Sequence, residues 1–418
     1  MNRRASRFLP DRSHLQGRYS GRRMLFLPGG TWQVPVIELA RMMGFYVICA
    51  DGTPHAPGFA AADEGVQISL QDSSGLVELG RSRRVDVVMT EQTDFAVPMV
   101  ARVSDALGLP GLPVAVADAA TNKRLMREAA QSAGIRQPRF RGCRTVDDVR
   151  AAVEELGLPL FYKPVDAQSS RGVGVLETDD METVSCALQR ATSASVCGEA
   201  SFEELILGTE CTVEGFVVDG KPTTLAISDK EHYADLPGVA RTLTWPPAFP
   251  QAVINAIAHA NEATVRAIGI PFGITHAEFL IDAHGEPWLV EIAGRGGGSR
   301  IPTHIVPAVT GFDPTPALID SLMGASPSVD KTEERACQLR FLRLPAGRVL
   351  RAVRNADELR SLPGVLDLHF NFQPGDRIPD VGDDRSRHGF VIAAGENRAE
   401  AIALADEVEH RLVFDLGD

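Results

Sequence analysis

Residues 277–300 read AEFLIDAHGEPWLVEIAGRGGGSR, and this stretch decides how the middle of the chain folds. Two apolar runs, 277–281 and 287–292, flank the turn sequence Asp-Ala-His-Gly. Short apolar runs on either side of a glycine-containing turn are typical of a β-hairpin. The hairpin puts Glu278 and Glu291 on neighbouring strands, so we expect their carboxylates to lie close together.

The two glutamates stand inside apolar strands, where a carboxylate is costly to bury unless a cation pairs with it. A pair of carboxylates beside phosphate oxygens suits Mg²⁺, which keeps several waters and shares ligands with a bound phosphate. Glu278 and Glu291 are therefore the candidate metal ligands. Arg295 follows in a glycine-rich run that permits close backbone approach, and its guanidinium suits a transferring phosphoryl group.

A second candidate segment, residues 163–174, reads KPVDAQSSRGVG. Lys163 ends a predicted buried strand and supplies a positive charge. The small side chains of Ser169 and Ser170, followed by Arg171, leave backbone N–H groups able to donate to phosphates. The alternative is a simple turn, which is the commoner role of a glycine-rich loop.

A third candidate segment, residues 201–210, reads SFEELILGTE. Glu203 ends a predicted strand, the apolar pair Leu205 and Ile206 follows, and Glu210 lies beyond a glycine. This order suits an adenine slot, with one carboxylate and backbone groups on the base and a second carboxylate on the ribose hydroxyls. The alternative is an edge strand with solvated acids.

Composition excludes several classes of protein. The 418 residues carry a formal net charge of -13, and an acidic chain argues against a nucleic-acid partner because phosphate contacts need clustered Lys and Arg. No window approaches about 18 consecutive apolar residues, so we expect no membrane span. The six cysteines are scattered without a CxxC pair, which favours free thiols in a reducing compartment and a cytoplasmic protein.

Four regions follow from the pattern of charge and hydrophobicity. Residues 1–23 hold seven arginines and no apolar segment, which indicates a disordered basic tail, with a transit peptide as the alternative. Residues 24–118 alternate apolar strands with helical patterns and predict a Rossmann-like parallel sheet. Residues 119–330 and 331–418 predict two further domains of α+β type with mixed or antiparallel sheets. Asp118 is the predicted N-cap of the helix that follows the first boundary.

Familiar nucleotide and hydrolase motifs are missing from the sequence. There is no GxxxxGK[ST], no GxSxG and no HExxH, so a bound nucleotide would not lie on a P-loop. A dinucleotide-binding oxidoreductase is suggested by Gly29 and Gly30 after the first strand and Asp51 at the end of the second. The turn lacks GxGxxG, however, and this alternative leaves Glu278 and Glu291 unexplained.

Taken together, five segments occur in the order and spacing of the ATP-grasp superfamily, which the chain resembles from about Met24 to its C-terminus. Within that superfamily the chain is similar to the carboxylate–amine ligases, which include L-amino-acid ligases. Much of the superfamily has Asn two residues after the second metal acid, where this chain has Ala293, so the number of metals is open. The five segments are marked by Lys123, by Lys163 with its loop, by Glu203 to Glu210, by Glu278, and by Glu291 to Arg295.

The resemblance implies a ligase that uses ATP and Mg²⁺, with Mn²⁺ as an alternative metal. It implies that a small-molecule carboxylate is joined to a small-molecule amine through an acyl phosphate. The residues that it assigns are Lys123 and Lys163 to the phosphates, Ser169, Ser170 and Arg171 to the closing loop, Glu203, Leu205 and Ile206 to adenine, Glu210 to ribose, Glu278 and Glu291 to metal, and Arg295, Lys163 and His276 to catalysis.

Contacts to the substrates are expected from three further residues. Glu91 follows a strand of the first domain, at the carboxyl edge where open α/β sheets bind ligands. Arg300 and His304 lie beyond the glycine run. The polar run 229–232 and the basic run 385–388 are expected to be surface loops. The alternatives place the first run near the acceptor pocket and let the C-terminal domain close one side of the site.

Two other functions remain open at this point. One is a purine-type ligase or carboxylase that acts on a phosphoribosyl amine, and the other is a non-catalytic ATP-binding module. The resemblance allows a homodimer, and the sequence names neither the carboxylate nor the amine.

Overall fold

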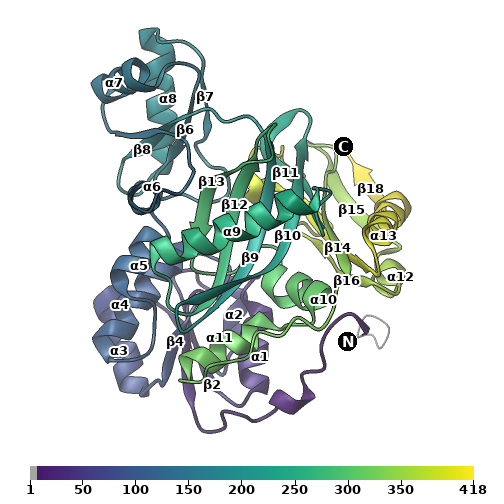
Figure 1. The fold of residues 1–418 in the computed structure, drawn as a ribbon. Coiled ribbons are helices and arrows are strands. Elements are labelled where there is room, and N and C mark those ends of the chain that lie inside the picture. Colours follow the sequence, from purple (N-terminus) through teal and green to yellow (C-terminus); the bar gives the residue numbers. More distant parts are fainter. Residues whose placement is uncertain (1–6) are drawn as a thin grey trace.

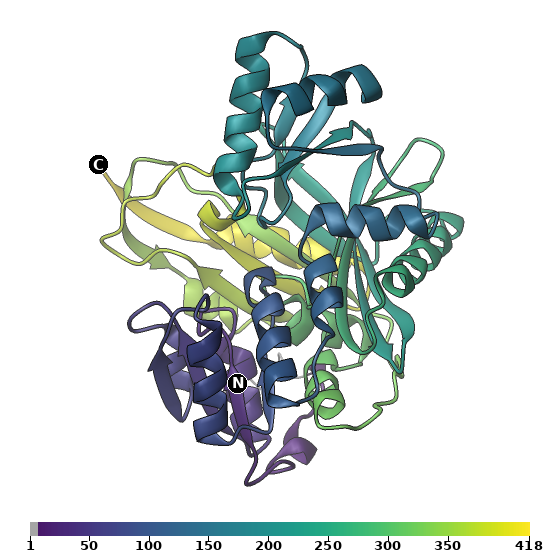
Figure 2. The same ribbon diagram turned by 90° about the vertical axis from the view of Figure 1, so that its left-hand side faces the viewer.

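The computed structural model describes residues 7–418, and residues 1–6 of the expected tail lie outside that range. Figures 1 and 2 show an N-terminal domain, a small projecting lobe, and a large sheet that runs from the middle of the chain into its C-terminal part. No helix within residues 7–418 is long and apolar enough to cross a membrane. All six cysteines are free thiols, as expected.

The N-terminal domain is built on a parallel sheet with strand order β3-β2-β1-β4, which confirms the predicted Rossmann-like fold. Three of its strands are short and apolar because helices cover both faces of the sheet, whereas the edge strand β3 is polar and partly exposed. The strands are β1 (Arg23–Phe26), β2 (Tyr46–Asp51), β3 (Glu64–Gln67) and β4 (Val87–Met89), and the helices are α1 (Val34–Met42), α2 (Pro57–Ala61), α3 (Ser73–Arg83), η3 (Asp94–Ala96), α4 (Val97–Leu107) and α5 (Val114–Ala119).

The prediction of a disordered tail is wrong for residues 7–23. Phe8 and Leu15 are buried, and the 3₁₀ helix η2 (Ser13–Leu15) lies between them. Two arginines of this segment, Arg12 and Arg18, form salt bridges with acids of a distant part of the chain. Those acids, Asp313 and Asp320, are about 300 positions away. The local composition does not reveal partners this distant, and it therefore suggested disorder.

Arg12 provides a first test of this packing. Its guanidinium donates to both carboxylate oxygens of Asp313, at 2.6 and 3.0 Å, and to the backbone oxygen of Thr303 at 3.2 Å. We expect Arg12→Ala to cost about 2 kcal/mol, because hydrogen bonds to charged groups contribute about 1.5–3 kcal/mol each. Thermal unfolding measures the loss. Arg22→Ala is the control, because its bond to Asp86 is solvent-exposed, and an equal shift in both variants would contradict the prediction.

The small lobe projects from the rest of the molecule in Figure 1 and contains the predicted phosphate loop. Its antiparallel sheet has the order β5-β8-β6-β7 and is covered on one side by two helices. Its elements are β5 (Phe140–Cys143), α7 (Val146–Leu156), β6 (Leu160–Pro164), β7 (Gly174–Leu176), α8 (Met181–Ala194) and β8 (Ala200–Glu204).

Helix α6 (Lys123–Ser132) leads into the lobe. Asp118 is not its N-cap, because Asp118 belongs to α5. Asn122 caps α6 instead, since its side chain accepts from the backbone N–H groups of Arg124 and Leu125.

The large sheet has eight antiparallel strands in the order β13-β12-β9-β10-β11-β14-β17-β16. Strand β11 pairs with β14, so the sheet runs without interruption across the boundary predicted at residue 331. The strands are β9 (Thr209–Val218), β10 (Lys221–Tyr233), β11 (Leu236–Trp245), β12 (Gly273–Ile281), β13 (Pro287–Ala293), β14 (Ala336–Leu342), β16 (Val365–Phe370) and β17 (Gly389–Gly395).

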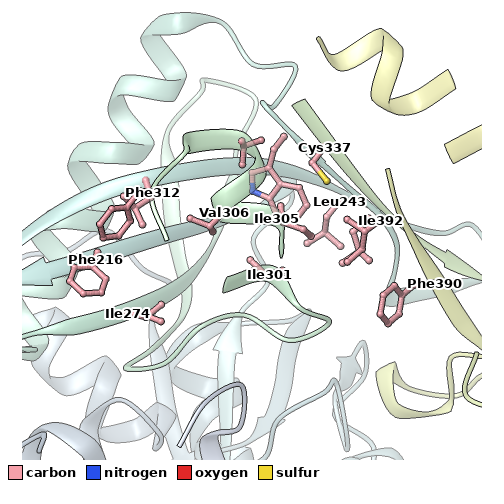
Figure 3. Close-up of a cluster of buried hydrophobic side chains, with 14 of the residues drawn as sticks. Phe216, Leu243, Ile274, Ile301, Ile305, Val306, Phe312, Cys337, Phe390 and Ile392 are labelled. Carbon is pink, nitrogen blue, oxygen red and sulfur yellow. The ribbon is translucent and has the colours of Figure 1, made fainter. Parts of the chain in front are cut away.

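Successive side chains along each strand point to opposite faces of this sheet, so each face has its own apolar side chains. Different helices pack against the two faces. On one face, the long helix α9 covers an apolar cluster that includes Val213 and Phe279. On the other, Phe216, Ile274 and Ile305 pack together, as Figure 3 shows. The remaining elements are α9 (Gln251–Ile268), the π-helix η4 (Ile301–Ile305), α10 (Val306–Thr310), α11 (Pro314–Leu322), β15 (Val349–Arg354), α12 (Ala356–Arg360), η5 (Asp384–Ser386), α13 (Arg398–Arg411) and β18 (Val413–Gly417).

Candidate active site

A cavity of about 1120 Å³ lies between the small lobe, the large sheet and the glycine-rich run after β13. Most of the residues singled out from the sequence line it, although they are spread over more than 170 positions. Those that line it are Lys123, Lys163, Ser169, Ser170, Arg171, Glu203, Leu205, Ile206, Glu210, His276, Glu278, Glu291 and Arg295.

Lys163 is held at the end of β6 by a buried network of charges. Its ammonium lies 3.0 Å from the Glu203 carboxylate, which also accepts from Arg127 at 2.9 and 3.1 Å and from Ser201 at 2.9 Å. Burial lowers the pKa of Lys163 to about 8, and Glu203 opposes this shift. Burial would raise the pKa of Glu203, but Arg127 and Lys163 outweigh it and lower that pKa to about 2.

This network changes the role expected of Glu203. Its carboxylate is engaged by two cations and a hydroxyl, so it has no free oxygen directed at an adenine base. Glu203 instead fixes the position of Lys163. The apolar wall of Leu205 and Ile206 still lines the cavity beside it.

The predicted pairing of Glu278 and Glu291 is confirmed, because the two residues are register partners on β12 and β13. Lys123 lies 2.7 Å from Glu291, and Lys230 lies 2.8 Å from Glu278. Burial would raise the pKa of Glu278, but Lys230 and His276 outweigh it and hold that pKa well below its usual range. Each of the two carboxylates therefore already has a cationic partner.

This donor set fits Mg²⁺ shared with a substrate better than a metal enclosed by protein. Within residues 7–418, no group of three or more His, Cys, Asp or Glu side chains is arranged to hold a metal ion. Two adjacent carboxylates suit Mg²⁺, because that ion commonly takes one or two carboxylates and completes its shell with waters and phosphate oxygens. Ala293, the register partner of His276, is buried and offers no side-chain ligand.

His276 is paired with an acid that the sequence did not suggest. Its Nδ1 lies 2.7 Å from Oε1 of Glu214, which stands on the neighbouring strand β9. Burial would lower the pKa of His276, but Glu214 outweighs burial and raises it to about 9. The imidazolium is thus a further cation beside Glu278, from which its Nε2 is 3.8 Å away.

Arg295 is fixed by Asp94 of the N-terminal domain. Its Nε and Nη2 donate to the two carboxylate oxygens of Asp94, at 2.8 and 2.5 Å. The backbone N–H of Asp94 donates to the side chain of Gln168 at 3.0 Å, and Gln168 belongs to the phosphate loop. One short segment therefore joins the arginine to the loop expected to close over the nucleotide.

The three expected substrate contacts do not line the cavity. Glu91 is fully buried behind the glycine-rich run, where it accepts from the N–H of Gly296 at 2.8 Å and from Gln92 at 2.9 Å. Burial raises the pKa of Glu91 to about 7, although these two bonds oppose the rise. A Cβ at Gly296 would lie 2.6 Å from Pro302, so the close approach needs glycine.

Arg300 and His304 also face away from the cavity. Arg300 forms a salt bridge of 2.5 Å with Asp367, and its backbone N–H donates to Gln92. Burial, with Arg300 and Arg12 nearby, lowers the pKa of His304 to about 3, so the imidazole is neutral. Glu91 and the backbone of Arg300 thus help to hold the glycine-rich run in place.

Several cavity residues were not expected from the sequence. The polar run 229–232 lies within β10, not in a surface loop, and Lys230 bridges Glu210 and Glu278. The Glu210 carboxylate also lies 2.8 Å from the His232 ring. Glu210 therefore already contacts two side chains, Lys230 and His232, before any ribose binds. In the basic run 385–388, Arg387 is partly buried and lines the cavity.

Comparisons with known proteins identify two domains of the chain. Residues 156–303 match the model of the ATP-grasp domain, and residues 340–417 match the model described as L-amino acid ligase C-terminal domain 2. The alanine–anticapsin ligase of Bacillus subtilis (strain 168) is 30% identical over 273 residues, which are 59% of this chain and 56% of that one. The match thus spans little more than half of that relative.

Two further comparisons cover nearly the whole chain. The formate-dependent phosphoribosylglycinamide formyltransferase of Oleidesulfovibrio alaskensis is 26% identical over 408 residues, which are 92% of this chain and 95% of that one. The crystal structure of L-amino acid ligase from Bacillus licheniformis has a TM-score of 0.80 at 21% identity and covers 95% of this chain and 99% of that one. At that identity the structural match shows the fold. The chain therefore contains an ATP-grasp domain, followed by a domain that matches the C-terminal domain 2 of the L-amino acid ligases.

Proposed function

We propose that this protein is an ATP-dependent carbon–nitrogen ligase. It activates a small-molecule carboxylate as an acyl phosphate and transfers the acyl group to a small-molecule amine. The observation that carries the proposal is the convergence of Lys123, Lys163 and Arg295 with Glu278 and Glu291 on one cavity. The L-amino acid ligase domain near the C-terminus supports the same reaction class.

The reaction has two steps. A carboxylate oxygen attacks the γ-phosphorus of ATP, the bond to the β–γ bridging oxygen breaks, and ADP leaves. The amine nitrogen then attacks the acyl carbon, inorganic phosphate leaves, and the nitrogen loses a proton. Both steps develop negative charge on oxygen. Fixed cations that stabilise this charge therefore supply most of the catalysis that the chain must provide.

The residues of the cavity divide this work. Lys123 and Lys163 would hold the phosphates, and Arg295 would contact the transferring phosphoryl group. Glu278 and Glu291 would hold Mg²⁺, which neutralises phosphate charge when bound. Because Lys123 now pairs with Glu291, its ammonium would exchange the carboxylate for a phosphate when nucleotide binds.

A purine-pathway ligase that acts on a phosphoribosyl amine is the second candidate. It is favoured by the near full-length match to the formate-dependent formyltransferase. The domain at residues 340–417 favours the amino acid ligase instead. A non-catalytic ATP-binding module is disfavoured, because the cations and acids that phosphoryl transfer needs all line the cavity.

The location and assembly of the protein are also proposals. The free thiols support a cytoplasmic location, where disulfides rarely form. A homodimer would be tested by light scattering on the full chain.

The test is ADP release with Mg²⁺ and ATP against amino acids and small carboxylates, supplied singly and in pairs. Release that requires a pair, with a new amide detected by mass spectrometry, supports the proposal. Release only with phosphoribosylglycinamide and formate supports the second candidate. Nucleotide binding without ADP release in any pool would indicate the non-catalytic module.

Glu291→Ala is the matched test of the metal site. Loss of a metal ligand removes several kcal/mol of transition-state stabilisation, and about 1.4 kcal/mol changes a rate tenfold, so we expect kcat to fall at least about 100-fold. Glu286→Ala is the control, because Glu286 lies on the turn of the same hairpin with a half-exposed side chain. Equal activity in the two variants would argue against Glu291 as a ligand.

A further inference from the structure

The first part of the described chain joins the two ends of the molecule. We call residues 8–19 the N-terminal strap. Its beginning packs into the C-terminal part of the chain, where Phe8 is buried against Ala308 of α10 and Ala394 of β17. Its end packs into the N-terminal domain, where Leu15 belongs to the core formed with β1, β2 and α1. Figure 1 shows the strap as the purple segment at the lower right, which runs between these two parts.

The middle of the strap binds the segment that follows the glycine-rich run. Arg12 donates to the backbone oxygen of Thr303 in η4 at 3.2 Å, and to the two carboxylate oxygens of Asp313 at 2.6 and 3.0 Å. Thr303 is buried, and the side chain of Asp313 is 12% exposed. Asp313 directly precedes α11, so one guanidinium ties η4 to the start of α11. A planar fork of N–H groups suits this set of three bonds, and the ammonium of a lysine does not offer one.

The backbone just before Thr303 has a conformation that depends on its surroundings. Ser299 and Arg300 both lie in the left-handed region, with φ of 53° and 65°. This conformation is costly for L-residues and persists only where surrounding contacts hold it. The next turn, η4, is a π-helix in which the N–H of Val306 donates to the oxygen of Ile301. Single π-helical turns are rare and are frequent at functional sites. A contact that holds η4 therefore also supports the two residues before it.

This backbone carries groups that line the cavity. Arg295, Ser299 and Ile301 all do so. The N–H of Ile301 donates to the oxygen of Gly298 at 3.2 Å, so η4 is hydrogen-bonded directly to the glycine-rich run. Arg12 does not line the cavity and reaches η4 from the other side. It can therefore influence the cavity only through the backbone that it holds.

We propose that Arg12 is a positioning residue for the ligase reaction, which holds the glycine-rich run in place through its bond to Thr303 of η4. The inference rests on the proposed function. Asp94 fixes the guanidinium of Arg295, and the strap fixes the backbone that carries it. Misplacing a catalytic group by about 1 Å costs about 100-fold in rate. The residues assigned to the nucleotide lie on other elements, so loss of Arg12 should act on kcat rather than on nucleotide binding.

The experiment compares Arg12→Ala with Arg18→Ala in the full chain. Arg18 is the matched control, because it belongs to the same strap but its guanidinium binds Asp320 of α11, at 2.7 Å, rather than η4. We expect kcat for ADP release to fall at least about tenfold in Arg12→Ala, with KM for ATP unchanged, and to change little in Arg18→Ala. Arg12→Lys should give an intermediate kcat, because its ammonium can still reach Asp313 but cannot reproduce all three bonds.

Hydrogen exchange of backbone amides gives a readout that does not depend on turnover. The N–H groups of Arg300, Ile301 and His304 are hydrogen-bonded, so their exchange reports local opening around η4. In Arg12→Ala we expect these amides to exchange at least about tenfold faster than in the wild type, because a hydrogen bond to a charged group contributes that much or more. In Arg18→Ala they should exchange at the wild-type rate. A purely stabilising role of Arg12 would instead speed exchange throughout the chain.

The two readouts separate this proposal from the proposed function. Faster exchange around η4 with a lower kcat in Arg12→Ala alone supports the positioning role. Faster exchange there, with no ADP release by the wild type in any pool, would retain the hold of Arg12 on η4 and overturn the ligase. An active wild type with equal kcat in Arg12→Ala and Arg18→Ala would overturn the positioning role and retain the ligase.

Discussion

Replacing Glu203 with glutamine is expected to lower the free energy of unfolding by about 3–5 kcal/mol, which is the usual cost of breaking a buried ion pair. The substitution keeps the size of the side chain and removes its charge. Arg127, which is fully buried, and Lys163, which is 4% exposed, would then face each other without a counter-charge. Nucleotide binding would weaken as well, because Lys163 would lose its fixed position.

The pH dependence of stability gives this prediction a second readout. The pKa of Glu203 is depressed from 4.5 to about 2, so its contribution is fully present above about pH 4.5 and is lost as pH falls towards 2. The wild-type protein should therefore lose stability over this window more steeply than Glu203→Gln, which has no carboxyl group there. Urea or thermal unfolding between pH 5 and pH 3 measures the difference.

Glu204→Gln is the matched control for this experiment. Glu204 is the next residue on β8, is 36% exposed, and lies 3.4 Å from an Arg139 that is itself 59% exposed. An exposed pair of this kind contributes about 0–1 kcal/mol. Arg127→Met combined with Glu203→Gln should recover part of the loss, because one buried cation remains instead of two. Equal losses of stability in Glu203→Gln and Glu204→Gln would contradict the assignment of the loss to the buried charge network.

The parts of the fold and site that could be predicted are those with a local signal. The hairpin 277–292 has apolar runs and a turn in one short stretch, so the pairing of Glu278 with Glu291 followed directly. The same holds for Lys163, which ends an apolar strand immediately before a loop of small residues. In each case the neighbours in sequence are also the neighbours in space.

The residues that were missed depend on partners far away in the sequence. The run 229–232 is polar throughout, so it shows no alternation of apolar and polar residues, and its pairing with β11 and β9 makes it a strand. Arg127 lies on a helix whose buried face is already explained by its apolar residues, so nothing local indicates that this arginine is buried. Its partner Glu203 lies 76 positions later. Glu91 follows β4 at the predicted edge, but the glycine-rich run, 205 positions further along the chain, covers it.

The second prediction with a large expected effect on kcat concerns Arg295 and Asp94, whose carboxylate accepts two of its hydrogen bonds. We expect Arg295→Lys to lower kcat by about 10³-fold, because arginines that stabilise a transferring phosphoryl group are worth about 10³–10⁵ and a lysine lacks the planar fork. We expect Asp94→Asn to lower kcat about 10–100-fold, since misplacing a catalytic group by about 1 Å costs about 100-fold. KM for ATP should change little in both variants.

The combination of the two variants decides whether Asp94 acts through Arg295. Asp94 accepts two of the arginine's hydrogen bonds, so its effect should nearly vanish once lysine replaces the arginine. Asp105→Asn, on an exposed position of the same domain, is the control and should leave kcat unchanged. If the effects of Asp94→Asn and Arg295→Lys were instead additive, Asp94 would act apart from the arginine.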